Sequence, residues 1–283
     1  TNLVFEECEF LNSNNDPNHR GAVGYGEIMF VGGKAKNFAL LSTKSLTLRR
    51  FIAGQVRLGT PTSGTTDKPY SDFLLEDCDF RGGVYAIDGE LNDFTLRHCK
   101  VKVFALYGAD VLGDALFEGI QEGYLIAAAA FKGRLTIRDC TFSGAEEKEY
   151  GLELSGDVPV HTLLENVTVN SRKPVDAIQQ RKPVEKWDDP PPNKSFIIKN
   201  CKIPHLKIDW AQTEHLRIEN CKFDYLDIKN GRIGRLEIIG CSLRKLDVSN
   251  TQVKTHDVRV PEGGKISGHV TVTTGSNIKL PRE

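Results

Sequence analysis

The chain of 283 residues lacks any apolar run close to the roughly 20 residues that a membrane-spanning helix needs, so we expect no membrane partner. Its start, Thr-Asn-Leu-Val-Phe-Glu-Glu-Cys, does not combine a basic stretch with an apolar segment, and no secretory signal is visible. The only methionine is Met29, and the first repeat unit begins at Leu3 with nothing ahead of it. We therefore expect the chain to be a piece of a longer protein.

The sequence also lacks the usual signatures of catalysis and of metal binding. It has no C-x-x-C pair, no glycine loop of the phosphate-binding type and no Ser-His-Asp arrangement that can be placed. The histidines are dispersed, and the repeat described below puts His205 and His215 at corners on opposite sides of a coil. We therefore expect no metal and no cofactor, and the sequence favours a protein without enzymatic activity.

Neither sign of charge dominates, because 37 Lys and Arg residues are balanced by 38 Asp and Glu residues. The two halves differ: residues 1–160 hold 16 basic and 23 acidic residues, a balance of −7, and residues 161–283 hold 21 and 15, a balance of +6. Neither balance is large enough to indicate a nucleic acid or a membrane surface as partner. If the halves are stacked end to end, they form a rod whose two ends carry opposite charge.

All the cysteines occur in one pattern, apolar-x-apolar-x-x-Cys-x-apolar, and the last three are spaced by 20 residues: Cys8, Cys78, Cys99, Cys140, Cys201, Cys221 and Cys241. An odd number of cysteines, each at the same place in a repeat, indicates buried thiols that pack as small apolar side chains rather than disulfides. We predict a structural column of thiols in the core, formed by Cys78, Cys99, Cys140, Cys201, Cys221 and Cys241. Reduced thiols favour a cytoplasmic location, or delivery into a host cytosol if the chain belongs to an effector protein.

A five-residue period governs the sequence from Phe196 onward. In each unit the first and third positions are mostly apolar and the others mostly polar, which is the alternation of a strand interrupted by a corner. Four units return the chain to its start after 20 residues, and residues that tolerate a left-handed backbone stand at the corners, among them Asp77, Asp139, Asn200, Asn220, Gly240, Asn230 and Asn250. The sequence therefore predicts an all-β fold, a right-handed parallel β-helix (solenoid) with about 20 residues per turn and loop insertions. Eleven or twelve turns give a rod of about 50–60 Å at the spacing of neighbouring strands.

Residues 196–255 resemble the pentapeptide-repeat family of right-handed quadrilateral β-helices. The central apolar residue of each unit is present except at Thr213, and the small residue two positions earlier is present as Cys201, Ala211, Cys221, Gly231, Cys241 and Thr251. Every second unit departs from the family by having Leu at this place. The resemblance implies a scaffold or partner-binding role, as in domains of bacterial effector proteins that precede a separate catalytic domain. It also implies, for some members, mimicry of DNA toward topoisomerases.

We expect residues 1–283 to form a single β-helix domain with four parts. These are irregular turns with long loops (1–170), a Pro-rich insertion (171–194), regular turns (195–260) and a terminal cap or tail (261–283). The insertion repeats Arg-Lys-Pro-Val and then offers an aromatic anchor, and such residues are common where partners bind. We predict contacts with a protein partner from Arg172, Lys173, Arg181, Lys182 and Trp187, so deletion of the insertion should abolish capture of that partner.

Three functions follow in order of preference. The first is a non-enzymatic scaffold or protein-binding module, part of a larger and possibly bacterial effector protein, because the core is regular and no catalytic cluster is visible. The alternative is a carbohydrate-binding or polysaccharide-cleaving β-helix, which the long loops of the N-terminal turns suggest. If neighbouring coils bring Asp88 and Asp110 together, these carboxylates form a candidate glycosidase pair. The third is a topoisomerase-binding DNA mimic, against which the basic character of residues 196–255 argues.

Overall fold

The computed structural model describes residues 2–10, 27–41, 45–59, 71–121, 123–143, 151–154, 159–171, 174–177, 193–259 and 270–272. About 75% of this part of the chain is strand and none of it is helix. A search of these residues accordingly finds no helix able to cross a bilayer.

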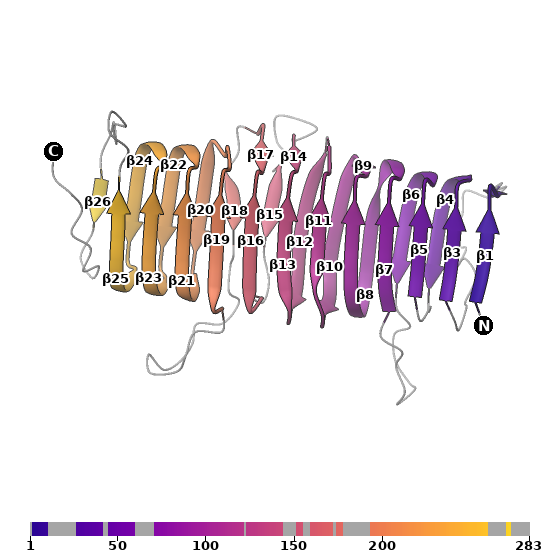
Figure 1. The fold of residues 1–283 in the computed structure, drawn as a ribbon, viewed down its shortest axis with the longest axis horizontal. Helices are drawn as coiled ribbons and strands as arrows, with labels where there is room; N and C mark the ends of the chain where they lie inside the picture. The colour runs from indigo at the N-terminus through magenta and orange to yellow at the C-terminus, as the bar shows by residue number, and fades with distance from the viewer. Residues whose placement is uncertain are drawn as a thin grey trace.

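The strands form a right-handed parallel β-helix, as the sequence predicts. In Figure 1 the near strands run upward, the far strands run downward and the chain advances from right to left, which defines a right-handed coil. Neighbouring strands along the coil pair in parallel. We call the near layer the front sheet and the far layer the rear sheet.

The front sheet stacks twelve strands, one per turn: β1 (Asn2–Glu6), β3 (Glu27–Val31), β5 (Ser45–Arg49), β7 (Ser71–Glu76), the end of β8 (Asp79–Arg97), β11 (Ala115–Glu118), β13 (Arg134–Arg138), β16 (His161–Glu165), β19 (Ser195–Lys199), β21 (Gln212–Glu219), β23 (Arg232–Ile239) and β25 (Gln252–Arg259). We number these turns 1 to 12 in this order. Twelve strands at a spacing of about 4.8 Å span about 53 Å.

The rear sheet is formed by β4 (Lys34–Leu41), β6 (Ile52–Gly59), the middle of β8, β10 (Val103–Val111), β12 (Tyr124–Phe131), β15 (Leu152–Leu154), β18 (Val175–Ala177), β20 (His205–Asp209), β22 (Lys222–Lys229), β24 (Ser242–Ser249) and β26 (Val270–Val272). Short strands lie on the narrow side that joins the two sheets: β2 (Glu9–Phe10), β9 (Lys100–Val101), β14 (Thr141–Phe142) and β17 (Thr168–Val169).

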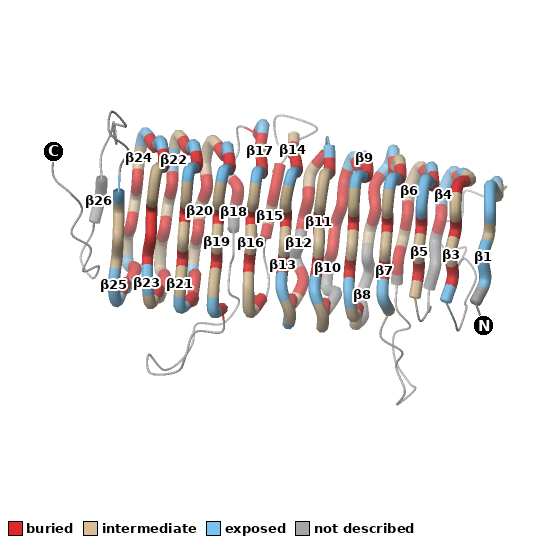
Figure 2. The backbone as a smooth tube through the Cα atoms, viewed as in Figure 1, coloured by how far each residue is buried: buried red, intermediate tan, exposed pale blue. Residues whose placement is uncertain are grey.

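Buried residues alternate with more exposed ones along the strands of both sheets (Figure 2), so the core runs the length of the rod. Leu206, Leu226 and Leu246 stack with 0% exposure on the rear wall. Cysteines line the corner after the front strands, where Cys78, Cys99, Cys140, Cys201, Cys221 and Cys241 are buried and free. Adjacent turns are linked through them, since the backbone N–H of Cys201 donates to Sγ of Cys221 at 3.3 Å.

Left-handed backbone angles mark the corners. Asp77, Asp139, Asn200, Asn220 and Gly240 have φ between 52° and 65° directly after a front strand, and Asn230 and Asn250 have φ of 52° and 50° after a rear strand. The corner prediction is therefore confirmed at these positions. Trp210 has the same left-handed conformation, with φ 60°, although this conformation is unfavourable for a bulky residue.

Candidate functional site

The outer surface of the front sheet is built from three columns of outward-pointing side chains, one residue per turn in each. Strand register rather than sequence spacing defines the columns, because the turns differ in length. The central column contains Val4, Met29, Thr47, Leu74, Thr95, Leu116, Thr136, Leu163, Ile197, Arg217, Glu237 and Asp257. Its first nine members are apolar or threonine.

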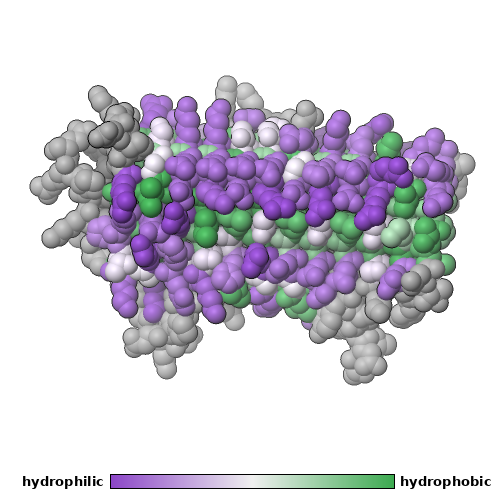
Figure 3. Space-filling model, in the orientation of Figure 1, coloured by the Kyte–Doolittle hydropathy of each residue, from purple (hydrophilic) through white to green (hydrophobic). Residues whose placement is uncertain are grey.

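This apolar stretch of the central column is open to solvent. Val4 is 59% exposed, and the eight members from Met29 to Ile197 are half-buried. Figure 3 shows the column as a green and white band between purple margins, and the band turns purple toward β25. A contiguous exposed apolar stripe with polar margins is typical of an interaction surface.

One margin is a charge column, formed by the last outward residue of each front strand: Glu6, Val31, Arg49, Glu76, Arg97, Glu118, Arg138, Glu165, Lys199, Glu219, Ile239 and Arg259. The sign of charge alternates without exception from Arg49 to Glu219. Glu118 thus lies between two guanidinium groups, with 2.9 Å from its Oε2 to Nε of Arg97 and 2.6 Å from its Oε1 to Nη2 of Arg138. Each exposed pair contributes little to stability, roughly 0–1 kcal/mol, so the alternation matters more for what can approach this surface.

The other margin is an entry column, named for its place where the chain enters each front strand: Glu27, Ser45, Asp72, Asp93, Asp114, Arg134, His161, Ser195, His215, Arg235 and Thr255. Carboxylates tie successive turns together here. Oδ1 of Asp93 accepts from the backbone N–H of Asp114 at 2.8 Å, and Oδ1 of Asp114 accepts from the N–H of Arg134 at 2.8 Å. The column is acidic in its first half and basic or neutral in its second.

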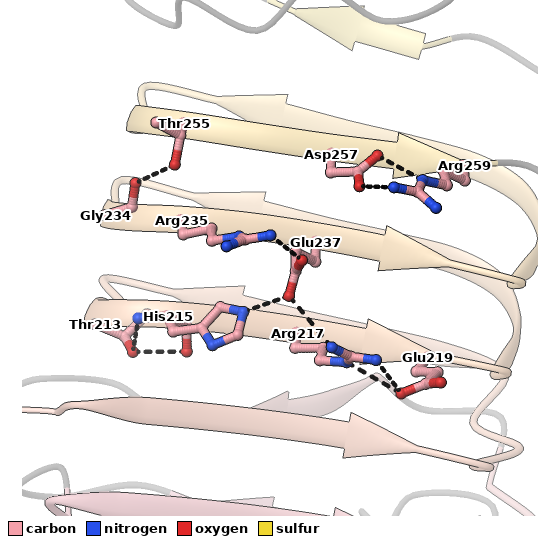
Figure 4. Close-up of polar contacts among 10 residues, drawn as sticks. All are labelled: Thr213, His215, Arg217, Glu219, Gly234, Arg235, Glu237, Thr255, Asp257 and Arg259. Carbon is pink, nitrogen blue, oxygen red and sulfur yellow. Dashed lines mark hydrogen bonds and ion pairs between the residues drawn. The ribbon is translucent and has the colours of Figure 1, made fainter.

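The polar end of the central column is organised around Glu237 (Figure 4). Its side chain is only 6% exposed and lies 2.6 Å from Nε2 of His215, 2.6 Å from Nη2 of Arg235 and 3.6 Å from Nη1 of Arg217. Burial alone raises the pKa of Glu237, but the hydrogen bonds from His215 and Arg235 outweigh it and hold that pKa below its ordinary value. These charged groups are already paired, which makes the end of the face a structural cluster.

The two histidines placed at opposite corners by the sequence do lie in different sheets. His205 on β20 is 3.1 Å from Oδ2 of Asp227 on the rear sheet, whereas His215 on β21 pairs with Glu237 on the front sheet. Within the described residues, no group of three or more His, Cys, Asp or Glu side chains is arranged to hold a metal ion.

The binding residues predicted in the insertion, Arg172, Lys173, Arg181, Lys182 and Trp187, lie outside the described residues. The range 171–194 that contains them is not a single excursion from the coil. Val175–Ala177 form β18, which pairs with β15 and β20, and Asn193 is fully buried. A loop replacement that spares the coil must therefore be confined to residues 178–192.

The candidate glycosidase pair Asp88 and Asp110 depends on how β8 and β10 align. Their register places Glu90, not Asp88, opposite Asp110. The coil therefore does not stack Asp88 and Asp110 as register neighbours.

Sequence reasoning missed the charge column, although its signal is present. The residue just before each left-handed corner alternates in sign from Arg49-Arg50 and Glu76-Asp77 through to Glu219-Asn220. Aligning the turns on their corner residues, rather than on a fixed spacing, reveals it.

No protein-family model matches the chain, and neither the curated proteins nor the solved structures include a significant match to it.

Proposed function

We propose that the chain is a non-enzymatic, protein-binding scaffold that contacts its partner through the outer surface of the front sheet. The observation that carries this proposal is the central column, in which nine successive turns present an apolar or threonine side chain to solvent. A soluble rod gains nothing from such a stripe, whereas a binding surface needs one.

The charged margins support the same function. Protein interfaces commonly have an apolar centre and a polar rim, and the charge and entry columns form such a rim on both sides of the central column. We also propose that the chain is related to pentapeptide-repeat proteins. The 20-residue coil of residues 193–259 and the small residue at each corner support this relationship. The proposed role in a larger, bacterial effector protein rests on that relationship alone.

Site-specific photo-crosslinking tests the proposal. A photoreactive amino acid replaces Leu116, at the middle of the central column, in cells that produce the full chain. The matched control replaces Lys207, on β20 of the rear sheet. We expect a covalent protein adduct of defined mass from position 116, lost when Leu163→Lys is added, and none from position 207. Absence of an adduct at 116, or equal adducts at both positions, would overturn the proposed function.

A further inference from the structure

We infer that the partner of this face is a second copy of the chain, bound front sheet to front sheet with the two rods antiparallel. This inference rests on the proposed function and names its partner. The two-fold axis runs along the strand direction, in the plane between the sheets, and passes between β11 and β13. Turn n of one copy then faces turn 13 − n of the other, and each column faces its own counterpart.

The charge column is self-complementary in this arrangement. The central contact sets Glu118 against Arg138 of the second copy, and the next sets Arg97 against Glu165. Continuing outward, the opposed pairs are Glu76 with Lys199, Arg49 with Glu219, Val31 with Ile239, and Glu6 with Arg259. Five pairs have opposite charge, and the two apolar members of the column meet each other.

The central column is complementary in size over turns 4 to 9. Its outer turns set apolar or threonine side chains against charged ones: Thr47 with Arg217, Met29 with Glu237, and Val4 with Asp257. Leu116 faces Thr136, and Thr95 faces Leu163. The two-fold axis repeats each pair, so a large side chain meets a small one at four places. Leu74 faces Ile197 one turn farther out. Alternation of large and small side chains across facing positions allows two sheets to interdigitate at about 10 Å.

The entry column gives the same alignment independently. Its acidic half meets its basic half, with Asp114 opposite Arg134, Asp93 opposite His161, and Glu27 opposite Arg235. The two halves of the sequence carry opposite net charge. Antiparallel packing therefore also brings the negative half of each rod to the positive half of the other.

Other alignments bring like charges together. A slip of one turn puts Glu118 opposite Glu118 and Arg97 opposite Arg138. A slip of two turns puts Asp93 opposite Asp114 in one direction and Arg49 opposite Arg259 in the other, and either direction loses two turns of contact.

Parallel rods, related by an axis along the rod, set the charge column against the entry column. This brings Arg97 to Asp93 but also Glu76 to Asp72, Glu118 to Asp114 and Arg138 to Arg134, and like charges across an interface cost several kcal/mol.

The available area is sufficient for a stable dimer. A face about 53 Å long and five residues, or about 16 Å, wide offers about 850 Å² per copy. Two copies then bury about 1,700 Å², which matches a standard protein–protein interface of about 1,600 Å².

Mixing two charge-reversed chains tests the inference without relying on either variant alone. Glu118→Arg sets arginine against Arg138 twice in its own dimer, and Arg138→Glu sets glutamate against Glu118 twice. In a mixed dimer, each chain meets an opposite charge at both places, while the contacts within each variant chain are the same as in its own dimer. Sedimentation equilibrium of differently tagged chains measures all three species.

We expect the wild-type chain to have twice the mass of a monomer, each variant alone to dimerise at least about tenfold more weakly, and the mixture to recover the dimer. Lys245→Glu on the rear sheet, in register with Tyr225, is the matched control and leaves the dimer intact.

Disulfide cross-linking between engineered cysteines tests which turns of the two copies face each other. Thr95→Cys in one chain should cross-link to Leu163→Cys in another, whereas Thr95→Cys and Thr47→Cys, which the alignment holds several turns apart, should not. A monomeric wild-type chain, or a mixture no stronger than its components, overturns the inference. If position 116 still cross-links to another protein in cells, the proposed function survives that result.

Discussion

Glu237 lies 2.6 Å from Nε2 of His215, one turn earlier in the front sheet, and therefore accepts a hydrogen bond from a histidine while almost removed from water. Nη2 of Arg235 approaches the other carboxylate oxygen to 2.6 Å. A nearly buried carboxylate with two donors on different strands joins turns 10 and 11 of the coil. Its ionisation state should therefore affect the stability of the C-terminal turns.

Replacement Glu237→Gln should lower the free energy of unfolding at neutral pH by about 1–2 kcal/mol, because a charge-assisted pair at the surface of the rod is lost. The pKa of Glu237 is lowered in the folded protein from the ordinary value of 4.5. Its contribution is therefore fully present above pH 4.5 and is lost as the pH falls through the lower folded value. Urea unfolding of both proteins at pH 7 and at acidic pH measures this. A difference that stays constant with pH would contradict the assignment, and Asp257→Asn, in an exposed pair with Arg259, serves as control.

The thiols should differ sharply in reactivity. Burial raises the pKa of the Cys140 thiol to about 12, and the thiolate is the reactive form. Cys8 is half-buried, whereas the other six cysteines are buried. A thiol reagent should label Cys8 in the native protein and all seven cysteines after denaturation, with Cys8→Ser abolishing native labelling. Rapid native labelling of Cys140 or Cys221 would show that the column is open to solvent.

The corner at Gly240 should accept a side chain only at a cost in stability. Its φ is +65°, and a Cβ atom there lies 2.5 Å from Oδ1 of Asn220, the corner residue of the previous turn. Gly240→Ala should therefore destabilise the protein by about 1–2 kcal/mol from the backbone angle, with a further cost from the contact. Adding Asn220→Gly removes the contact but not the angle, so thermal unfolding should show partial recovery. If the thermal stability recovers fully, or not at all, the cost is not shared between the backbone angle and the contact with Asn220.

The coil, its hand and its corners could be predicted because they depend on local patterns. Apolar alternation, a small residue at each corner and Asn, Asp or Gly before it recur within a few residues, so Cys78 and Asn220 could be placed without knowing the rest. Loops do not disturb such patterns. The irregular turns at Phe51 and Val167, where another apolar residue replaces cysteine, could be predicted for the same reason.

The outer columns could not be found this way, because they depend on which residues of different turns meet. Arg49 and Glu76 are 27 residues apart and Glu165 and Lys199 are 34 apart, yet each pair is in register. The insertion attracted attention through its composition, whereas Leu116 and Thr136 are unremarkable in sequence and gain meaning only from their neighbours in the sheet.

Thr213 illustrates an exception that the structure explains. It stands where the repeat expects an apolar residue, is 1% exposed and donates from Oγ1 to Oδ1 of Asn193 at 2.6 Å. Asn193 is fully buried and donates from Nδ2 to the carbonyl of Pro159 at 2.7 Å. The polar residue at position 213 is therefore required by the amide one turn earlier.

This pairing predicts a non-additive response to substitution. Asn193→Ala leaves the hydroxyl of Thr213 and the carbonyl of Pro159 with fewer partners in the core, and should cost about 2–3 kcal/mol of unfolding free energy. Thr213→Val keeps the shape but removes the donor to Asn193, and should cost about 1–2 kcal/mol. In the double variant the shared hydrogen bond is lost only once, so urea unfolding should give a coupling energy of about 1 kcal/mol.

Ile233→Val, in the turn above Thr213, is the control: it removes a methylene from the same column, makes no hydrogen bond with Asn193, and its effect should add to that of Asn193→Ala. If Thr213→Val proves equally additive, the hydrogen bond does not hold the segment that enters β19 to β21, and the polar residue in the core has another cause.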